Sequence, residues 1–291
     1  MMGAAELKSW QGKTVVVKYG GNAMLDASLK KAVAQDIADL WQAGVRIVIV
    51  HGGGPEITGL LKAMNKKSEF IAGLRVTDAE TATLAEMALV GKTNPELVNY
   101  INRAGVRAVG LNGKDADLFE VRKHLATVYE SGVARQVDIG FVGEVASVRA
   151  ELLTTLMDAG YVPVIAPIGA DAEGQTYNIN ADTAAAAVAA QLKADVFLLL
   201  TDVEGVFRDY CDKSSLICEL PFDEATEMIK CGVVDGGMIP KVQACMGALE
   251  KGAQLARVVD GRRPHCIVES LLPGNAAGTA VVKQKAVTVN G

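Results

Sequence analysis

A run of three consecutive valines that leads into a lysine and two glycines constrains the fold of this chain more than any other feature. The run lies in Lys13–Met24 (KTVVVKYGGNAM), where Lys18 comes directly after the valines and Gly20 and Gly21 come shortly after it. Uninterrupted β-branched residues are typical of a strand buried on both faces, as in a parallel sheet. A cation and bare backbone amides at the end of such a strand suit phosphate binding, although an ordinary strand-to-helix turn has the same pattern.

The same pattern occurs a second time. Arg46–Val50 (RIVIV) predicts another buried strand, and His51, three glycines (Gly52–Gly54) and Pro55 follow it directly, with Pro55 suited to the first turn of a helix. Because the carboxyl ends of parallel strands meet at one edge of a sheet, the two glycine turns would face one crevice. A composition that is 50% hydrophobic but only 5% aromatic favours a helix-covered parallel sheet over a β-sandwich. The sequence therefore predicts an α/β fold.

The rest of the composition favours a soluble cytoplasmic enzyme. The net charge is −5 and no block of Lys and Arg stands out, which argues against a nucleic-acid partner. The first residues, MMGAAELKSWQGK, lack the apolar core of a signal peptide, and no unbroken apolar stretch is long enough to span a membrane. The five cysteines form no CxxC pair and predict reduced, mostly buried thiols, while the three histidines are scattered and form no metal-ligand cluster.

Hydrophobic periodicity predicts helices and strands in alternation along most of the chain. Helices are expected at Leu29–Ala43, Glu56–Met64, Ala79–Leu89, Asn94–Ala104, Ala150–Ala159, Thr183–Leu192, Phe222–Cys231 and Met238–Lys251. Further strands are expected at Ala108–Leu111, Tyr161–Ile165, Val196–Leu200, Leu255–Val259 and Thr279–Val282. Glycine-broken runs predict hairpins within Leu118–Glu144, and Ile71–Asp78 is expected to be irregular, with Asp78 capping the next helix.

Two familiar nucleotide motifs fail on spacing. Gly91-Lys92-Thr93 resembles the end of a P-loop, but Glu86 stands where the first glycine is required, and a helical pattern precedes it. Gly52–Gly54 resembles a dinucleotide fingerprint, but Ile57 occupies the position of the third glycine. A nicotinamide-dependent oxidoreductase therefore remains only as an alternative.

Two lysines near glycines, Lys18 and Lys241, are the candidate phosphoryl-binding cations. Lys241 falls in the first turn or so of the helix after Gly236-Gly237, where a cation is mildly unfavourable unless an anion binds there. For Lys241 taken alone, an ordinary surface lysine is the alternative. Asp182 either caps the helix that follows it or lies between the two lysines and holds both ammonium groups. Asn178 and Asn180 would add neutral hydrogen-bond donors nearby.

Other polar residues also leave two interpretations open. Arg75 either faces solvent from its loop or clamps a carboxylate with its guanidinium group. His51 fits a structural imidazole bonded to the backbone better than a catalytic base, and His124 fits the surface.

Six segments, taken together and in order, resemble the amino-acid kinase family over nearly the whole chain. They are KYGGNAM (Lys18–Met24), HGGGPEI (His51–Ile57), GLRVTD (Gly73–Asp78), YNINAD (Tyr177–Asp182), LLLTDVEGV (Leu198–Val206) and GGMIPKV (Gly236–Val242). GLRVTD is most similar to members that phosphorylate N-acetyl-L-glutamate in arginine biosynthesis. The resemblance implies an open αβα sandwich, with an acceptor lobe and dimer contacts at residues 1–193 and an ATP-binding lobe at residues 194–291.

The resemblance also implies a role for each matching residue. Lys18 and Lys241 would stabilise the phosphoryl group passing from MgATP to the side-chain carboxylate of N-acetyl-L-glutamate, and Asp182 would organise them. Backbone N–H groups for the phosphoryl group and acceptor would come from Gly20, Gly21, Gly52 and Gly53. Binding of N-acetylglutamate would use Gly53, Gly54, Arg75, Asn178 and Asn180. The nucleotide site would be lined by Thr201, Asp202, Gly205, Val206 and Met238, with ATP and Mg²⁺ required and no protein metal site.

Regulation is where the chain departs from the family pattern. Arginine-inhibited members have a long N-terminal helix that links dimers into a hexamer, whereas only twelve residues precede Lys13 here. The resemblance to the family by itself implies a homodimer or a higher homo-oligomer. The segment Pro264–Thr279 resembles the arginine-binding stretch at His265-Cys266, but Ser270 stands at the position of its glutamate. Inhibition by arginine is therefore an open hypothesis. Rival functions are phosphorylation of a related acyl-amino acid and a catalytically silent nucleotide sensor.

Overall fold

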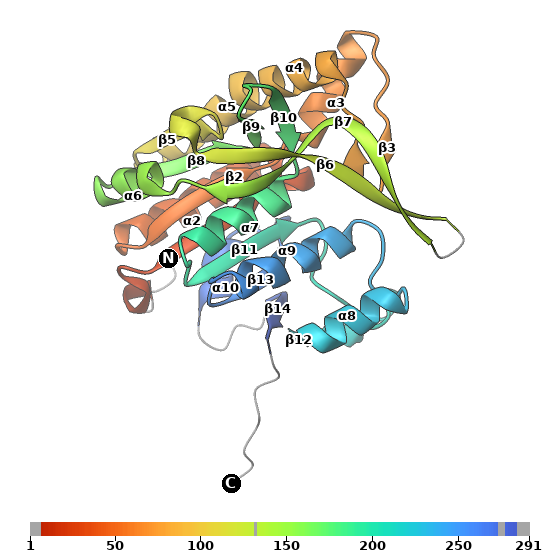
Figure 1. Ribbon diagram of the computed structural model, residues 1–291. Helices are drawn as coiled ribbons and strands as arrows, with labels where there is room; N and C mark the ends of the chain where they lie inside the picture. Colours follow the sequence, from red (N-terminus) through yellow and green to blue (C-terminus); the bar gives the residue numbers. More distant parts are fainter. Residues whose placement is uncertain (1–6, 131–132, 273–276, 284–291) are drawn as a thin grey trace.

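A long twisted sheet forms the centre of the molecule (Figure 1). The computed structural model describes residues 7–130, 133–272 and 277–283, and within them the sheet has eight strands. In the order in which they pair, these are β12 (Glu219–Pro221), β14 (Thr279–Val282), β13 (Ala256–Asp260), β11 (Val196–Thr201), β1 (Thr14–Tyr19), β2 (Arg46–His51), β8 (Val162–Ala166) and β5 (Ala108–Asn112). Neighbours pair in parallel except β13 and β14, so the prediction of a mainly parallel sheet is confirmed.

Helices cover both faces of this sheet. The described α-helices are α2 (Ala27–Gln42), α3 (Gly54–Ala63), α4 (Ala79–Ala88), α5 (Asn94–Arg103), α6 (Glu151–Asp158), α7 (Ala181–Gln191), α8 (Phe222–Lys230), α9 (Met238–Glu250) and α10 (Cys266–Leu271). The valines of β1 show why two layers form, because all three are fully buried. Val16 packs into the core beneath α7 and α9, while Val15 and Val17 point to the opposite core beneath α2, α5 and α10. This is the expected αβα sandwich.

A second group of strands lies on the side of α7. β10 (Thr176–Ile179), β7 (Val133–Val148), β6 (Phe119–Glu130) and β9 (Ile168–Ala170) pair in a closed cycle. β6 and β7 form one long hairpin that runs above α7 in Figure 1, which confirms the hairpin character expected for Leu118–Glu144. Thr77 joins β7 through two backbone bonds, from its N–H to Ile139 O (2.9 Å) and from Phe141 N–H to its carbonyl (2.6 Å). The hairpin thereby holds the loop that carries Arg75.

Two expectations need correction, and one strand was not predicted. The segment expected to be irregular, Ile71–Asp78, forms most of a short hairpin in which β3 (Phe70–Ile71) pairs with β4 (Leu74–Arg75). The edge strand β12 was not predicted, because three residues ending in proline give no periodic signal. The thiols are not mostly buried: Cys245 and Cys266 are, but the other three cysteines lie exposed in the loops and helix end around β12 and α8.

The predicted boundary near residue 194 does not interrupt the sheet, because β1 of the first segment pairs with β11 of the second. The two lobes would therefore differ in what they bind, acceptor or nucleotide, and not in belonging to separate sheets; this division stays a prediction. None of the helices in the described residues has the length and apolar character needed to cross a membrane.

Candidate active site

Three charged side chains from distant parts of the chain meet at the carboxyl end of β1. Asp182 Oδ1 lies 2.9 Å from Lys18 Nζ of β1, and its Oδ2 accepts a 2.7 Å hydrogen bond from Lys241 Nζ of α9. The Lys18 contact is an ion pair without hydrogen-bond geometry. We name these three residues the Lys–Asp–Lys group. The geometric expectation that Asp182 lies between both lysines is confirmed.

Burial and charge act in opposite directions on this group. The side chain of Asp182 is only 6% exposed, and burial alone would raise its pKa. The charges of Lys18 and Lys241, together with the hydrogen bond from Lys241, outweigh burial and lower that pKa to about 2. The carboxylate is therefore ionised at neutral pH. The group as a whole carries one positive charge more than negative, at a place where Lys241 is still 20% exposed.

Asp182 is free for this role because another residue caps its helix. Asn180 is the N-cap of α7, and its side-chain oxygen accepts bonds from the N–H groups of Asp182 (2.8 Å) and Thr183 (3.2 Å). The interpretation of Asp182 as the N-cap is therefore wrong. The side-chain oxygen of Asn180 is used in the cap, so only its side-chain NH₂ group remains for a ligand. Asn178, two residues earlier on β10, is half-buried.

The glycines after β1 and β2 make room for the Lys–Asp–Lys group. A Cβ added at Gly20 would lie 2.8 Å from Lys18 Nζ and 3.7 Å from the Cα of Gly52. The two glycine turns are thus neighbours, as parallel strand ends require. Gly21 has φ +76, and a Cβ there would meet the Asp202 carboxylate at 2.6 Å. Larger side chains would fill this cradle, which suits the close approach of an anion to the backbone.

The prediction for Gly52 needs a correction. Its N–H donates to Tyr19 O at 2.7 Å, and therefore cannot bind a phosphoryl group. Gly53 is the N-cap residue of α3, and within the described residues its N–H has no protein acceptor. The available donors on this turn thus come from Gly53 onward, at the positive end of the α3 dipole.

Arg75 does not face solvent. It is 7% exposed, and its guanidinium donates to Gly54 O (3.0 Å), to Thr58 Oγ1 (2.9 Å) and to Ser68 Oγ, while its plane covers the Phe70 ring. Burial lowers its pKa, but the group stays charged at neutral pH. Among the described residues no carboxylate lies within ion-pair distance of it. Neutral groups hold this cation beside the N-terminus of α3, which leaves its charge for an anionic ligand.

Of the residues expected at the nucleotide site, Thr201 and Asp202 lie at the carboxyl end of β11, which pairs with the end of β13. Thr201 is the last residue of β11, Asp202 lies against Gly21, and Met238 is the first residue of α9. Val206 is different: it is 2% exposed, its N–H donates to Thr279 Oγ1, and its carbonyl accepts from Ile217 N–H. Val206 therefore presents no free polar group, and Gly205 packs on the same threonine.

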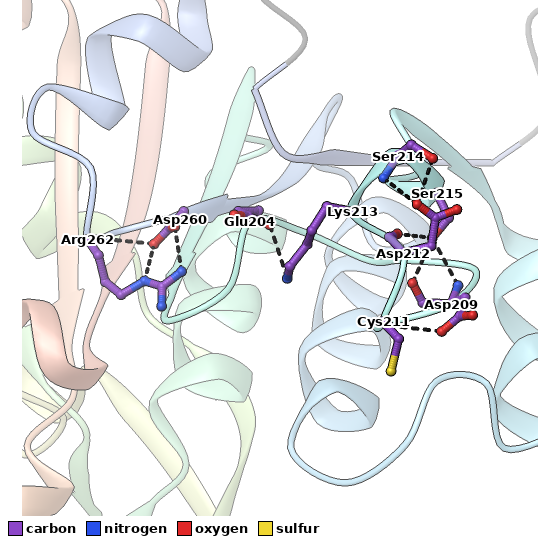
Figure 2. A network of polar contacts seen from close by, with 9 residues as sticks. All are labelled: Glu204, Asp209, Cys211, Asp212, Lys213, Ser214, Ser215, Asp260 and Arg262. Atoms are coloured by element: carbon purple, nitrogen blue, oxygen red, sulfur yellow. Dashed lines mark hydrogen bonds and ion pairs between the residues drawn. The ribbon is translucent and has the colours of Figure 1, made fainter.

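Figure 2 shows the charged network beside these strand ends. Arg262 binds Asp260 at the end of β13 with a two-pronged contact of 2.8 Å on each side, and Lys213 Nζ lies 3.3 Å from Glu204. Lys213 also lies 4.5 Å from the ring centres of both Phe207 and Tyr210. The contacts of Lys213 with Glu204, Phe207 and Tyr210 join distant parts of the loop that follows β11. In the described residues no cluster of three or more His, Cys, Asp or Glu side chains is arranged to hold a metal ion.

Sequence reasoning missed the residues that support the site. Thr58 and Ser68 hold Arg75, and Asn94 contacts His51 from a distance of 43 residues along the chain. The expectation that His51 bonds to the backbone is confirmed, since Nδ1 lies 2.7 Å from Gly52 O. A polar residue at the start of a predicted helix, next to a proline, was the one signal that could have singled out Asn94.

This combination of a parallel sheet, paired lysines and bare glycine turns defines a phosphoryl-transfer class of α/β protein. Residues 13–260 match the amino acid kinase family, and the chain belongs to that family.

The relatives agree with this assignment. The chain is 50% identical to the acetylglutamate kinase of Desulfitobacterium hafniense (strain DSM 10664 / DCB-2) over 94% of its own length and 92% of that protein. It is 51% identical to the acetylglutamate kinase of Symbiobacterium thermophilum (strain DSM 24528 / JCM 14929 / IAM 14863 / T) over 95% of this chain and 94% of that protein. The N-acetylglutamate synthase of Neisseria gonorrhoeae, solved with coenzyme A and N-acetyl-glutamate, has the same fold. The TM-score is 0.81 at 24% identity over 97% of this chain, which spans only 62% of that solved chain.

Proposed function

We propose that this chain transfers the γ-phosphoryl group of ATP to the side-chain carboxylate of N-acetyl-L-glutamate, a step of arginine biosynthesis. The observation that carries the proposal is the Lys–Asp–Lys group beside the glycine turns of β1 and β2. The chain is about 50% identical in sequence to acetylglutamate kinases over nearly its whole length, which supports this choice of acceptor.

The chemistry needs charge more than it needs a base. A carboxylate acceptor with a pKa of about 4.3 is already ionised at neutral pH, so no residue has to remove a proton. The obstacle is that one anion must approach another. Lys18 and Lys241 would stabilise the charge on the transferring group, and Asp182 would keep their ammonium groups in position. The buried His51 is unsuited to acid–base work, because burial lowers its pKa to about 4.

The acceptor would lie beside Arg75 and the N-terminus of α3, which are in contact with each other. Arg75 already donates to Gly54 O and Thr58, so its position is fixed before a substrate arrives. The N–H groups of Gly53 and Gly54 would bind carboxylate oxygens at the positive end of the helix dipole. Asn178 and the amide of Asn180 would contact the rest of the molecule.

The nucleotide would bind across the ends of β11 and β13, with Thr201, Asp202 and Gly205 beneath it and Met238 at the start of α9 beside it. Gly20 and Gly21 fit a phosphate chain, because their missing side chains leave the backbone open next to Lys18 and Asp202. Mg²⁺ would enter with the phosphates, whose charge it neutralises, since Mg²⁺ is commonly held by substrate phosphates and few protein groups.

An ADP-release assay tests the proposal. With wild-type protein, MgATP and N-acetylglutamate, ADP release should rise well above the rate without acceptor. N-acetyl-aminoadipate in place of N-acetylglutamate should give a much lower kcat/KM. Equal ADP release with and without N-acetylglutamate would contradict the proposal, as would a preference for the longer acid, and nucleotide binding without turnover would favour a sensor.

We further propose a cytoplasmic homodimer, in keeping with five free cysteines. Arginine inhibition stays a hypothesis that the C-terminal segment weakens. Ser270 is 6% exposed and its hydroxyl donates to Ile267 O, while Glu269 binds Arg263; residues 273–276 lie outside the described residues. Activity that stays flat as arginine is added would remove the hypothesis, and size-exclusion chromatography with light scattering would measure the oligomer.

A further inference from the structure

His51 ends β2 fully buried, and its two ring nitrogens have different partners. Nδ1 lies 2.7 Å from the carbonyl oxygen of Gly52, and Nε2 lies 3.1 Å from the side-chain nitrogen of Asn94. A carbonyl oxygen can only accept, so Nδ1 must carry the proton and donate it to Gly52 O. The ring therefore has one defined tautomer if Nε2 accepts.

Asn94 decides that second point. Its side-chain nitrogen also lies 2.9 Å from Val164 O of β8, which again can only accept. This contact fixes the amide with its NH₂ group toward Val164 and His51, because the flipped amide would place two oxygens together. A Cβ on Gly110 would lie 2.0 Å from Asn94 Oδ1, so the neighbouring strand β5 also leaves the amide little freedom. Asn94 thus donates to Nε2, and His51 is the neutral, Nδ1-protonated imidazole.

The tautomer of His51 fixes the orientation of the peptide bond between Gly52 and Gly53. Gly52 is held at both of its polar groups, with its N–H on Tyr19 O and its carbonyl on His51 Nδ1. The described residues contain no cis peptide bond, so the Gly53 N–H points away from the Gly52 carbonyl. A Cβ on Gly53 would lie 2.3 Å from the buried Leu89, which closes the other side of this turn. The direction of the Gly53 N–H is therefore set by the imidazole.

We propose that His51 is a positioning residue whose tautomer, imposed by Asn94, fixes the direction of the Gly53 N–H at the N-terminus of α3 so that it binds the anionic acceptor or the transferring phosphoryl group. The inference rests on the proposed function for its role in turnover, but the hydrogen-bond relay itself exists without substrate. It gives the buried histidine a part in catalysis without any proton transfer. A freely rotating peptide would instead have to be ordered at each turnover.

A tautomer measurement on wild-type protein tests the relay directly. Nitrogen-15 NMR of His51, assigned against a His51→Asn sample, should show a protonated Nδ1 and an unprotonated Nε2 between pH 6 and pH 8. A protonated Nε2 in that range would overturn the inference, because Asn94 could then not be the donor. The measurement uses no substrate, so its failure is distinct from failure of the proposed function.

Two substitutions separate positioning from packing. The side-chain nitrogen of His51→Asn reaches the place of Nδ1 and can still donate to Gly52 O, whereas that of His51→Gln reaches the place of Nε2 and cannot. Removing such a donor outright costs about 100- to 1,000-fold in kcat, and misdirecting it costs less, so kcat of His51→Asn should exceed that of His51→Gln by about tenfold or more. KM for ATP should change little in either variant. His124→Asn and His124→Gln, on the β6–β7 hairpin, are the matched controls and should not differ from each other.

Thermal unfolding of both His51 variants completes the test. Both should lose a similar amount of stability, since both lose the ring and its packing. If kcat falls equally in the two variants, or follows Tm alone, His51 is a packing residue and the inference is wrong. If wild-type protein releases no ADP with N-acetylglutamate, the proposed function fails, while the tautomer result still decides the relay.

Discussion

Asp182 and Asp36 are both buried aspartates, yet their surroundings shift their pKa values in opposite directions. Asp182 lies between two ammonium groups at the carboxyl end of β1. Asp36, on α2, is 0% exposed and accepts bonds from His265 Nδ1 (2.8 Å) and from the N–H groups of Ile267 and Val268. Burial raises the pKa of Asp36 to about 6, because these bonds only partly offset it. The pKa of Asp182 falls to about 2.

The difference separates a site built for charge from a contact built for packing. At Asp182 two cations overcome the cost of burial, and the carboxylate stays charged across the physiological range. At Asp36 one half-exposed histidine and two backbone donors hold α10 onto α2 without a full counter-charge. The first arrangement suits phosphoryl transfer; the second ties the C-terminal segment to the N-terminal helix.

Asp182→Asn should have the largest effect on stability. It removes the carboxylate but leaves two lysines with no counter-charge between them, which typically costs about 3–5 kcal/mol in the free energy of unfolding. Urea denaturation at pH 7 measures the change. Asp36→Asn is the matched substitution and should cost far less at this pH, because its carboxylate is poorly stabilised there. Equal losses in both variants would remove the distinction between the two sites.

Lys18→Ala and Lys241→Ala should act on turnover. Each removes one cation from the transferring phosphoryl group, and the loss of such an electrostatic donor costs on the order of 3–4 kcal/mol of barrier, or hundreds-fold in kcat. Steady-state ADP release gives kcat, and circular dichroism checks the fold. Lys13→Ala is the control, because Lys13 precedes the same strand and forms an exposed pair with Asp195. Turnover near that of wild type in either variant would refute the role of the Lys–Asp–Lys group.

Asp36→Asn should change how stability depends on pH. With a pKa near 6 when folded and near 3.8 when unfolded, Asp36 binds its proton more readily in the folded chain. Its contribution is therefore complete below about pH 4 and is lost as pH rises to about 6, by ~3 kcal/mol in all. Denaturation curves at pH 4, 5, 6 and 7 should show this loss in wild type and not in Asp36→Asn. Asp39→Asn, on the same helix, is the control and should keep the wild-type slope.

His265→Ala should have the smallest effect. It removes one hydrogen bond to Asp36, worth about 1 kcal/mol. His265→Asn is the better-matched variant, because its amide can still donate from the place of Nδ1 and asparagine tolerates the left-handed φ of +61 at this position. His265→Ala should therefore be less stable than His265→Asn at pH 7, and its loss of stability with rising pH should extend further. Identical curves would show that the histidine bond contributes nothing to Asp36.

The sequence predicted features that depend on neighbouring residues. Consecutive valines and the glycines behind them placed β1, β2 and their adjacent turns, and Asp78 caps α4 as expected. The meeting of Lys18 with Asp182 was one of two interpretations, since the residues alone could not separate a cap from a counter-ion. The structure separates them, because Asn180 takes the cap.

Features that depend on distant pairing could not be predicted. The amide donor of Asn94 reaches His51 only because β2, β8 and β5 are neighbours in the sheet. The N–H of Gly52 donates to Tyr19 O because β1 and β2 are neighbours in the sheet. No local sequence pattern predicts that pairing. Asp36 is one polar residue on the inward side of an amphipathic helix, and its partners lie more than 200 residues away.

Trapping of the phosphorylated product with hydroxylamine tests the central claim most directly. Hydroxylamine converts an acyl phosphate to a hydroxamate, whereas the inorganic phosphate from simple ATP hydrolysis gives none. Wild-type protein should form hydroxamate only when ATP and N-acetylglutamate are both present, and Lys241→Ala should form it hundreds-fold more slowly. ADP release without hydroxamate, or equal rates in wild type and Lys241→Ala, would contradict the account.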